Sequence, residues 1–294
     1  MGDPARLAPR ADAVDTPSGA ALYERYRDPP DAAIPGWNDT LDILVAHRSV
    51  RRYRPDPLPP GTIELLVAAA QSAASSSNLQ PWSVVAVEDP ARKARLAALA
   101  GNQQQIVQAP LFLLWIVDHH RLTRIGAQRD TPAAGLHFLE SFLLGAVDTS
   151  LAAQNAVVAL ESIGLGSCYI GGIRNNPAEV AAELGLPPQA FALFGLTVGY
   201  PDPATPAAVK PRLPQKAVLF RERYAVPDAA PDAGDPVDPA IAAYDRRLRS
   251  FQREQLLPER DWSEQASQRV RGAESLAGRD VLRTVLRGLG FRLD

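Results

Sequence analysis

The chain has 294 residues, and its 31 Lys and Arg against 33 Asp and Glu give a formal net charge of −2. This balance argues against a dedicated nucleic-acid binder, which usually carries a basic excess. A single Cys excludes an intrachain disulfide and any Cys-rich zinc or iron–sulfur site. Only three of the basic residues are Lys, so a Lys is more informative in this chain than an Arg cluster.

The first 36 residues are rich in Ala, Pro, Asp and Arg, which predicts a mostly irregular N-terminal arm over residues 1–36. Leu22, Tyr23 and Tyr26 could form a short docking helix within this arm. Globular patterning begins near Trp37, and we expect one domain over residues 37–294. A Pro-rich linker, Val226 to Pro239, sets off a helical C-terminal piece, residues 226–294.

The elements expected after Trp37 are long helices and a few short strands. A short helix begins at a capping Asp39 or Thr40, and longer ones cover Thr62–Ala74, Pro90–Ala100, Leu136–Ile163, with a break near Gly145, and Pro177–Leu184. Strands are expected over Ser83–Val87, Leu111–Val117, Ser167–Ile170 and Phe191–Tyr200. The strands lack the regular strand–helix alternation of a doubly wound fold, so the pattern predicts an α+β fold.

The longest apolar region, residues 142–160, contains Asp148. A membrane-spanning helix needs about 20 apolar residues with few charges, so this pattern favours a buried helix and no membrane partner. The N-terminus has no apolar run of signal-peptide length, which favours a cytoplasmic protein. Neither a P-loop nor a nucleophile elbow occurs, and the pair His119-His120 is better explained as a surface loop than as a metal site. No metal is therefore expected.

Three polar segments remain as candidates for chemistry. Arg48-Ser49-Val50-Arg51-Arg52 offers guanidinium and hydroxyl groups that suit a phosphate, although a solvated Arg cluster explains the segment better when it is taken alone. Ser75-Ser76-Ser77-Asn78 could wrap a polar ligand or be a flexible loop. Lys210-Pro211-Arg212 places a rare Lys in a stiff, Pro-rich segment, which favours an anion site.

A fourth segment, Tyr169-Ile170-Gly171-Gly172, ends a predicted strand in a glycine pair. Glycine lets backbone approach a flat ring closely, although a simple tight turn would also use it. Together the segments suggest a phosphate-bearing cofactor held by residues far apart in the sequence.

These segments occur in one order with further motifs: Val147-Asp148-Thr149, Ala153-Gln154-Asn155-Ala156, Ile173-Arg174-Asn175-Asn176, Phe194-Gly195-Leu196, Leu213-Pro214, Trp262-Ser263 and Gly290-Phe291. As an ordered set they resemble the oxygen-insensitive NADPH nitroreductase and NADPH–flavin oxidoreductase family of the nitroreductase superfamily. The resemblance runs from about Trp37 to the C-terminus.

The resemblance implies an intertwined homodimer that binds FMN, with a small mixed or antiparallel sheet surrounded by helices. Its C-terminal excursion would embrace the partner. The implied flavin contacts include His47, Arg48 and Ser49 at the phosphate and ribityl chain, to which Lys210 and Arg212 return. Arg51 would stabilise charge at the pyrimidine end of the flavin, and Gln103 would hydrogen-bond to it. The remaining implied cofactor residues are Ser75, Ser76, Ser77, Tyr169, Ile170, Gly171 and Gly172.

The family's nucleotide site is matched in part. Arg260, before Asp261-Trp262-Ser263, and Arg279 correspond to the arginines that hold the 2′-phosphate of NADPH. The family pattern Glu-Ser-Arg reads Glu274-Ser275-Leu276 here, so an insertion is needed to recover Arg279. This departure leaves the choice between NADPH and NADH open.

The implied activity is two-electron reduction of nitro compounds, quinones or flavins, which are small aromatic oxidants. Hydride would pass from NADPH to flavin N5 and then to the acceptor by a ping-pong mechanism, with no catalytic side-chain acid or base. Two alternatives remain: an NADPH:FMN reductase that supplies reduced flavin to a partner oxygenase, and a non-catalytic flavin-binding protein.

Overall fold

The computed structural model describes residues 16–28, 34–224 and 239–294, so most of the predicted Val226–Pro239 linker lies outside the described residues. The described residues divide into two compact units. The first contains residues 16–28, 34–48, 208–224 and 239–275, and the second contains residues 49–207 and 276–294.

The second unit is built on one four-stranded antiparallel sheet of order β1-β2-β4-β3. The strands are β1 (Trp82–Val87), β2 (Leu111–Asp118), β3 (Gly166–Ile170) and β4 (Ala190–Gly199). All four predicted strands are confirmed to within one residue at each end. The sheet with its surrounding helices also confirms the α+β class and, of the two predicted strand arrangements, the antiparallel one.

Strand β2 lies inside the sheet and is apolar on both faces. Phe112, Leu114 and Ile116 face one hydrophobic cluster, and Leu111, Leu113 and Trp115 face the other. All six side chains are at most 2% exposed. Successive side chains of a strand point to opposite faces, so this continuous apolar run requires helices on both sides.

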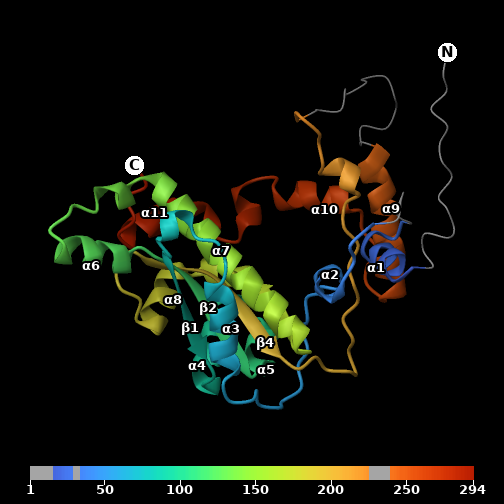
Figure 1. Ribbon diagram of the computed structural model, residues 1–294, viewed down its shortest axis with the longest axis horizontal. Coiled ribbons are helices and arrows are strands. Elements are labelled where there is room, and N and C mark those ends of the chain that lie inside the picture. The colour runs from blue at the N-terminus through green and yellow to red at the C-terminus, as the bar shows by residue number, and fades with distance from the viewer. Residues whose placement is uncertain (1–15, 29–33, 225–238) are drawn as a thin grey trace. The chain divides into compact units, whose positions relative to one another are not determined.

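Helices cover both faces of the sheet (Figure 1). One face of the sheet packs on α4 (Pro90–Leu99), α5 (Gln104–Gln108) and α8 (Pro177–Leu184). The other face packs on α3 (Thr62–Gln71) and α7 (Leu139–Ser162). The unit also contains α6 (His120–Gln128), α11 (Leu282–Gly288) and the short 3₁₀ helices η2 (Ser76–Asn78), η3 (Ala134–His137), η4 (Gly171–Asn175) and η7 (Arg279–Val281).

Helix α7 is continuous, so the predicted break near Gly145 is wrong. A Cβ at Gly145 would lie 2.8 Å from the Val117 side chain, which shows that this glycine serves close helix–strand packing. The helix is long and apolar enough to cross a membrane by length and composition. However, one face of it lies buried against the sheet, and Asp148 is 3% exposed and hydrogen-bonded within the fold, as expected for a core helix.

Two smaller predictions are wrong for local reasons. His119 is buried rather than in a surface loop, because its ring packs 5.3 Å from that of Phe291 at the C-terminal end of the chain. The first predicted cap is displaced: the side chain of Asn38, rather than Asp39 or Thr40, accepts a hydrogen bond from the N–H of Leu41.

The first unit is helical. It contains α1 (Pro17–Tyr26), α2 (Asp39–Val45), η5 (Gln215–Ala217), α9 (Pro239–Glu254), α10 (Trp262–Arg269) and most of η6 (Ala273–Leu276). The expected docking helix in the N-terminal arm is therefore present as α1. The predicted helical C-terminal piece includes α9, where Tyr244, Leu248 and Phe251 are buried.

The close packing of the sheet can be tested by substitution of Gly195. A Cβ at this position of β4 would lie 2.3 Å from the Phe112 ring. Gly195→Ala should therefore lower the free energy of unfolding by about 2 kcal/mol, measured by urea denaturation. Gly288→Ala is the matched control, because a Cβ there meets nothing within 4 Å. Equal stabilities for the two variants would contradict this packing.

Candidate flavin-binding site

The glycine pair follows β3, an edge strand, and opens η4. A Cβ at Gly172 would lie 2.5 Å from both the Ala100 carbonyl oxygen and the Gln103 amide nitrogen, so only glycine fits there. The Gln103 amide donates to the Ala100 carbonyl at 3.0 Å and accepts from the Gln105 amide at 2.7 Å. The structure thus brings two predicted flavin contacts, Gly172 and Gln103, against each other.

Two guanidinium groups lie beside Gly171. A Cβ built on this glycine is 3.3 Å from Arg174 Nη2 and 3.8 Å from Arg279 Nη1. The Arg279 Nε donates to the Asn175 Oδ1 at 2.8 Å, and Arg174 donates to the Leu193 carbonyl. Burial, and then the neighbouring charge of Arg279, lowers the pKa of Arg174. Paired cations of this kind favour binding of an anion, since it relieves their repulsion.

A cavity of about 220 Å³ adjoins this pair and is lined by residues 174–179, 278, 279, 281, 282 and 285. Arg279, predicted to contact NADPH, therefore lies next to a glycine predicted to contact the flavin. No role was predicted for Arg174. Only its position, two residues after the glycine pair, could have indicated a role for Arg174 in the site.

The serine loop, residues 75–78, leaves α3 in strained backbone. Ser77 and Asn78 have φ values of 49° and 53°, the left-handed region in which residues other than glycine are uncommon. Asp148 of α7 anchors the loop: the Ser75 hydroxyl donates to its carboxylate at 2.7 Å, and the Ser76 N–H donates to it at 3.3 Å. Backbone strain that surrounding structure holds in place is often found at ligand sites.

Ser49 and Arg51 lie along β3. Ser49 forms a β-bridge with Ser167, and the N–H of Val50 donates to the Ser167 carbonyl at 2.8 Å. Tyr53 fixes this segment through a 2.6 Å bond from its hydroxyl to the Val50 carbonyl. Arg51 is exposed, and its charge opposes the rise in the Cys168 thiol pKa that burial causes, which places it near β3.

Tyr169 and Ile170 have different environments on β3. The Tyr169 ring packs edge-on against Phe194 at 5.1 Å, and its hydroxyl donates to the Gln154 amide oxygen at 3.4 Å. Ile170 is buried in the core. Tyr169 is 37% exposed, so its side chain is accessible to a ligand, whereas Ile170 could contact one only through its backbone.

In the first unit, the predicted phosphate segments lie close together. The carbonyls of His47 and Lys210 both accept hydrogen bonds from the Arg25 guanidinium. The N–H of Arg212 donates to the Arg25 carbonyl at 3.1 Å. Arg48 is exposed and bends back to donate to the Ala46 carbonyl at 3.1 Å.

Arg260 is exposed between α9 and α10, where its N–H donates to the Gln252 side chain at 2.8 Å. It belongs to the first unit and Arg279 to the second. The shared role of these two arginines in holding NADPH stays a prediction.

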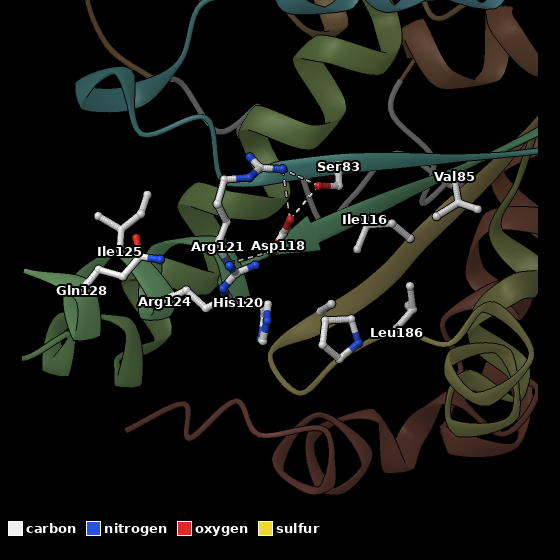
Figure 2. Close-up of a pocket in the computed structure, with 12 residues that line it drawn as sticks. Ser83, Val85, Ile116, Asp118, His120, Arg121, Arg124, Ile125, Gln128 and Leu186 are labelled. Atoms are coloured by element: carbon white, nitrogen blue, oxygen red, sulfur yellow. Dashed lines mark hydrogen bonds and ion pairs between the residues drawn. The ribbon is translucent and has the colours of Figure 1, made fainter.

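The second unit has another cavity, of about 360 Å³, whose lining comes mainly from β1, β2, α6 and the start of β4, with no residue of β3. Figure 2 shows Arg121 reaching toward Ser83 and Asp118 on its wall. Arg121 donates to the Ser83 hydroxyl at 2.5 Å and to the Asp118 carboxylate at 3.1 Å. No residue of the predicted flavin set lines this cavity, so we place the candidate site at the opposite, β3 edge.

Comparison with known proteins decides the family. The nitroreductase family profile matches residues 44–200, and the profile of the nitroreductase family C-terminal domain matches residues 210–294. The chain belongs to the nitroreductase family. This confirms the predicted family, and with it the assignment of the chain as an oxidoreductase.

Individual relatives agree with this assignment. The chain is 36% identical to an FMN reductase (NADPH) of Bacillus subtilis over 78% of its own length and 90% of the relative. It is 38% identical to the oxygen-insensitive NADPH nitroreductase of Salmonella typhimurium over 72% and 82% of the two chains. Among solved structures, it matches the NADPH:FMN oxidoreductase of Vibrio harveyi complexed with NAD+, with a TM-score of 0.75 and 32% identity, over 87% of this chain and 100% of that one. The last match confirms the nitroreductase-like fold.

The contact that holds the serine loop can be tested by substitution of Asp148. Asp148→Ala removes the acceptor of two hydrogen bonds and should lower the free energy of unfolding by about 2 kcal/mol, whereas Asp148→Asn should lose less. Hydrogen exchange at residues 75–80 should also accelerate. Ser150→Ala is the control on the same helix, because its hydroxyl bonds only locally to Ala146 in an exposed position. A stability of Asp148→Ala equal to that of the control would contradict the anchoring role.

Proposed function

We propose that this protein is an FMN-dependent NADPH oxidoreductase that reduces small aromatic oxidants, namely nitro compounds, quinones or flavins. The observation that carries the proposal is the packing at the end of β3, where Gly172 lies against Gln103 and Gly171 lies beside two guanidinium groups. This segment combines glycine backbone, which carries no side chain of its own, with local positive charge. Both features suit a flat cofactor and an anionic nucleotide.

The residues present fit FMN. The Lys210 segment and Arg48, which belong to the first unit, supply cations of the kind that its phosphate needs. When bound, FMN supplies the hydride chemistry at its N5 position, and the protein supplies binding and electrostatics. Arg51 is the residue we expect to stabilise negative charge at the pyrimidine end of the ring.

The chemistry requires no side-chain nucleophile or general acid. Among the described residues, no group of three or more His, Cys, Asp or Glu could hold a metal ion. Arg279 is the residue we expect to contact the NADPH phosphate, with Arg174 as its newly identified neighbour. All three proteins described above are named for NADPH, which supports this nucleotide.

Cofactor and nucleotide can be tested together. The purified protein should be yellow, the extracted flavin should be FMN, and NADPH should bleach it anaerobically faster than NADH does. Initial rates at varied NADPH and nitroaromatic concentrations should give parallel double-reciprocal lines, the pattern of a ping-pong mechanism. A colourless protein that cannot be reconstituted would refute the proposal. Bound FMN without NAD(P)H oxidation would instead identify a non-catalytic flavin-binding protein.

We also propose that the protein is a cytoplasmic homodimer that pairs through α7. Leu139, Leu143, Val147 and Leu151 recur every four residues along this helix and are 48%, 51%, 56% and 44% exposed. The only charged residue between Ser141 and Leu160 is Asp148, which is buried. A second copy of the chain would cover this uncharged stripe, while the opposite face of the helix packs on the sheet.

Val147→Asp should disrupt this contact, because it places a charge within the apolar stripe. Analytical ultracentrifugation should give a dimer for the natural protein and a monomer for the variant. Ala94→Asp introduces the same charge on the exposed face of α4 and should stay dimeric. A natural protein that is monomeric, or that partitions into membranes, would contradict the proposal.

A further inference from the structure

Helix α1 lies before the part of the chain that the family profiles match, yet one of its side chains is deeply placed within the first unit. Arg25 is 7% exposed. Its Nε and Nη2 donate to the Val45 carbonyl at 3.0 and 2.6 Å, Nη2 also donates to the His47 carbonyl, and Nη1 donates to the Lys210 carbonyl at 2.9 Å. One guanidinium therefore joins three backbone carbonyls from two distant segments.

Two of these carbonyls belong to predicted phosphate ligands. His47 begins the motif that continues with Arg48 and Ser49, and Lys210 begins the Lys-Pro-Arg segment. The third carbonyl, of Val45, ends α2, where a helix carries partial negative charge that a cation stabilises. The planar fork of Arg presents several donors at fixed angles, so it sets the distance between segments that lie 163 residues apart in the chain (47 against 210).

The Lys210 segment is held from further directions. The carbonyl of Arg25 accepts the N–H of Arg212 at 3.1 Å, and the hydroxyl of Tyr244 on α9 donates to the Pro211 carbonyl at 2.9 Å. Each contact uses the segment's backbone. The Arg212 guanidinium also donates to the Lys210 carbonyl, at 3.4 Å, so this carbonyl is held by two guanidinium groups.

Helix α1 is itself anchored in the same unit. Thr16 caps its first turn by accepting the N–H of Gly19 at 3.0 Å, and Leu22 is buried. Beyond its last turn, Arg27 pairs with Glu254 of α9 at 3.2 Å, and Asp28 pairs with Arg247. The helix is therefore fixed well enough to hold Arg25 in one position.

We propose that Arg25 is a positioning residue for the cofactor phosphate, holding the His47 and Lys210 segments in the arrangement that binds it. This rests on the proposed binding of FMN. The alternative is that Arg25 only stabilises the fold. The two differ in one respect: a positioning role weakens binding of FMN but not of riboflavin, which has the same ring and ribityl chain without the phosphate.

The experiment measures FMN and riboflavin affinity of flavin-free full-length protein by quenching of flavin fluorescence. The informative quantity is the ratio of the riboflavin Kd to the FMN Kd. Arg25→Gln should lower this ratio about tenfold or more, through loss of charged hydrogen bonds that fix the phosphate segments, with the riboflavin Kd changed by less than about twofold. Arg25→Lys, which keeps the charge but not the fork, should give an intermediate ratio.

Arg27→Gln is the matched control, because it removes an ion pair of the same helix without touching the phosphate segments, and its ratio should equal that of the natural protein. Lys210→Met should also lower the ratio, because it removes a positive charge that we expect to contact the phosphate. The double variant Arg25→Gln/Lys210→Met should then show less than the sum of the two logarithmic losses, as expected for residues acting on one phosphate. Circular dichroism of each variant checks that it is folded, and Arg25→Lys supplies the test if Arg25→Gln is not.

The outcomes separate the two proposals. If the natural protein binds neither flavin, the proposed function fails. If the natural protein prefers FMN and both Arg25 variants keep its ratio, the positioning role is wrong while the proposed function stands. If the two affinities fall together in folded variants, Arg25 has only a structural role, and the inference is overturned.

Discussion

The burial of β2 on both faces is the constraint on which the second unit depends. Because Leu111 to Val117 are apolar on both sides of the sheet, helices must cover both faces and polar groups are displaced to the edges and loops. The consequences reach the candidate site. The glycine pair is at the end of the β3 edge strand, where backbone groups can face a ligand rather than a neighbouring strand.

The polar segments of both units share a second feature. Buried side chains hold each segment in place through its backbone or its short side chains. Asp148 holds the serine loop, Tyr53 holds the segment after Ser49, and Arg25 holds the His47 and Lys210 segments. A binding site needs ligand-facing groups held in place by surrounding contacts. This arrangement meets that need while leaving exposed charges such as Arg48 and Arg51 at the surface.

Much of the fold could be predicted from local pattern. The unbroken apolar run of β2 and the glycines that end the helices are local signals, so strands and most helices are found within a few residues. Burial of His119 was not predictable in the same way, because it depends on Phe291 at the other end of the chain. The short helices α5 and α6 were also not predicted; α6 begins at His120, within the His pair that was interpreted as a surface loop.

The candidate site likewise contains some residues that the sequence indicates and others that it does not. Gly171 and Gly172 belong to the ordered motifs and Gln103 was implied by the family resemblance, and the structure places Gly172 against Gln103. Arg174 was present in a quoted motif without a role, and Arg25 lay in an arm expected to be mostly irregular. In an Arg-rich chain, neither stands out by composition. Their importance depends on contacts over long sequence separations, such as the bond from Arg25 to Lys210, which no local pattern encodes.

A crystal structure of the full-length protein, purified with its own cofactor, would test the central claim most directly. The account predicts electron density for FMN, with its phosphate contacted by the Lys210 side chain. FMN bound with its phosphate away from Lys210, or a structure without flavin, would contradict it.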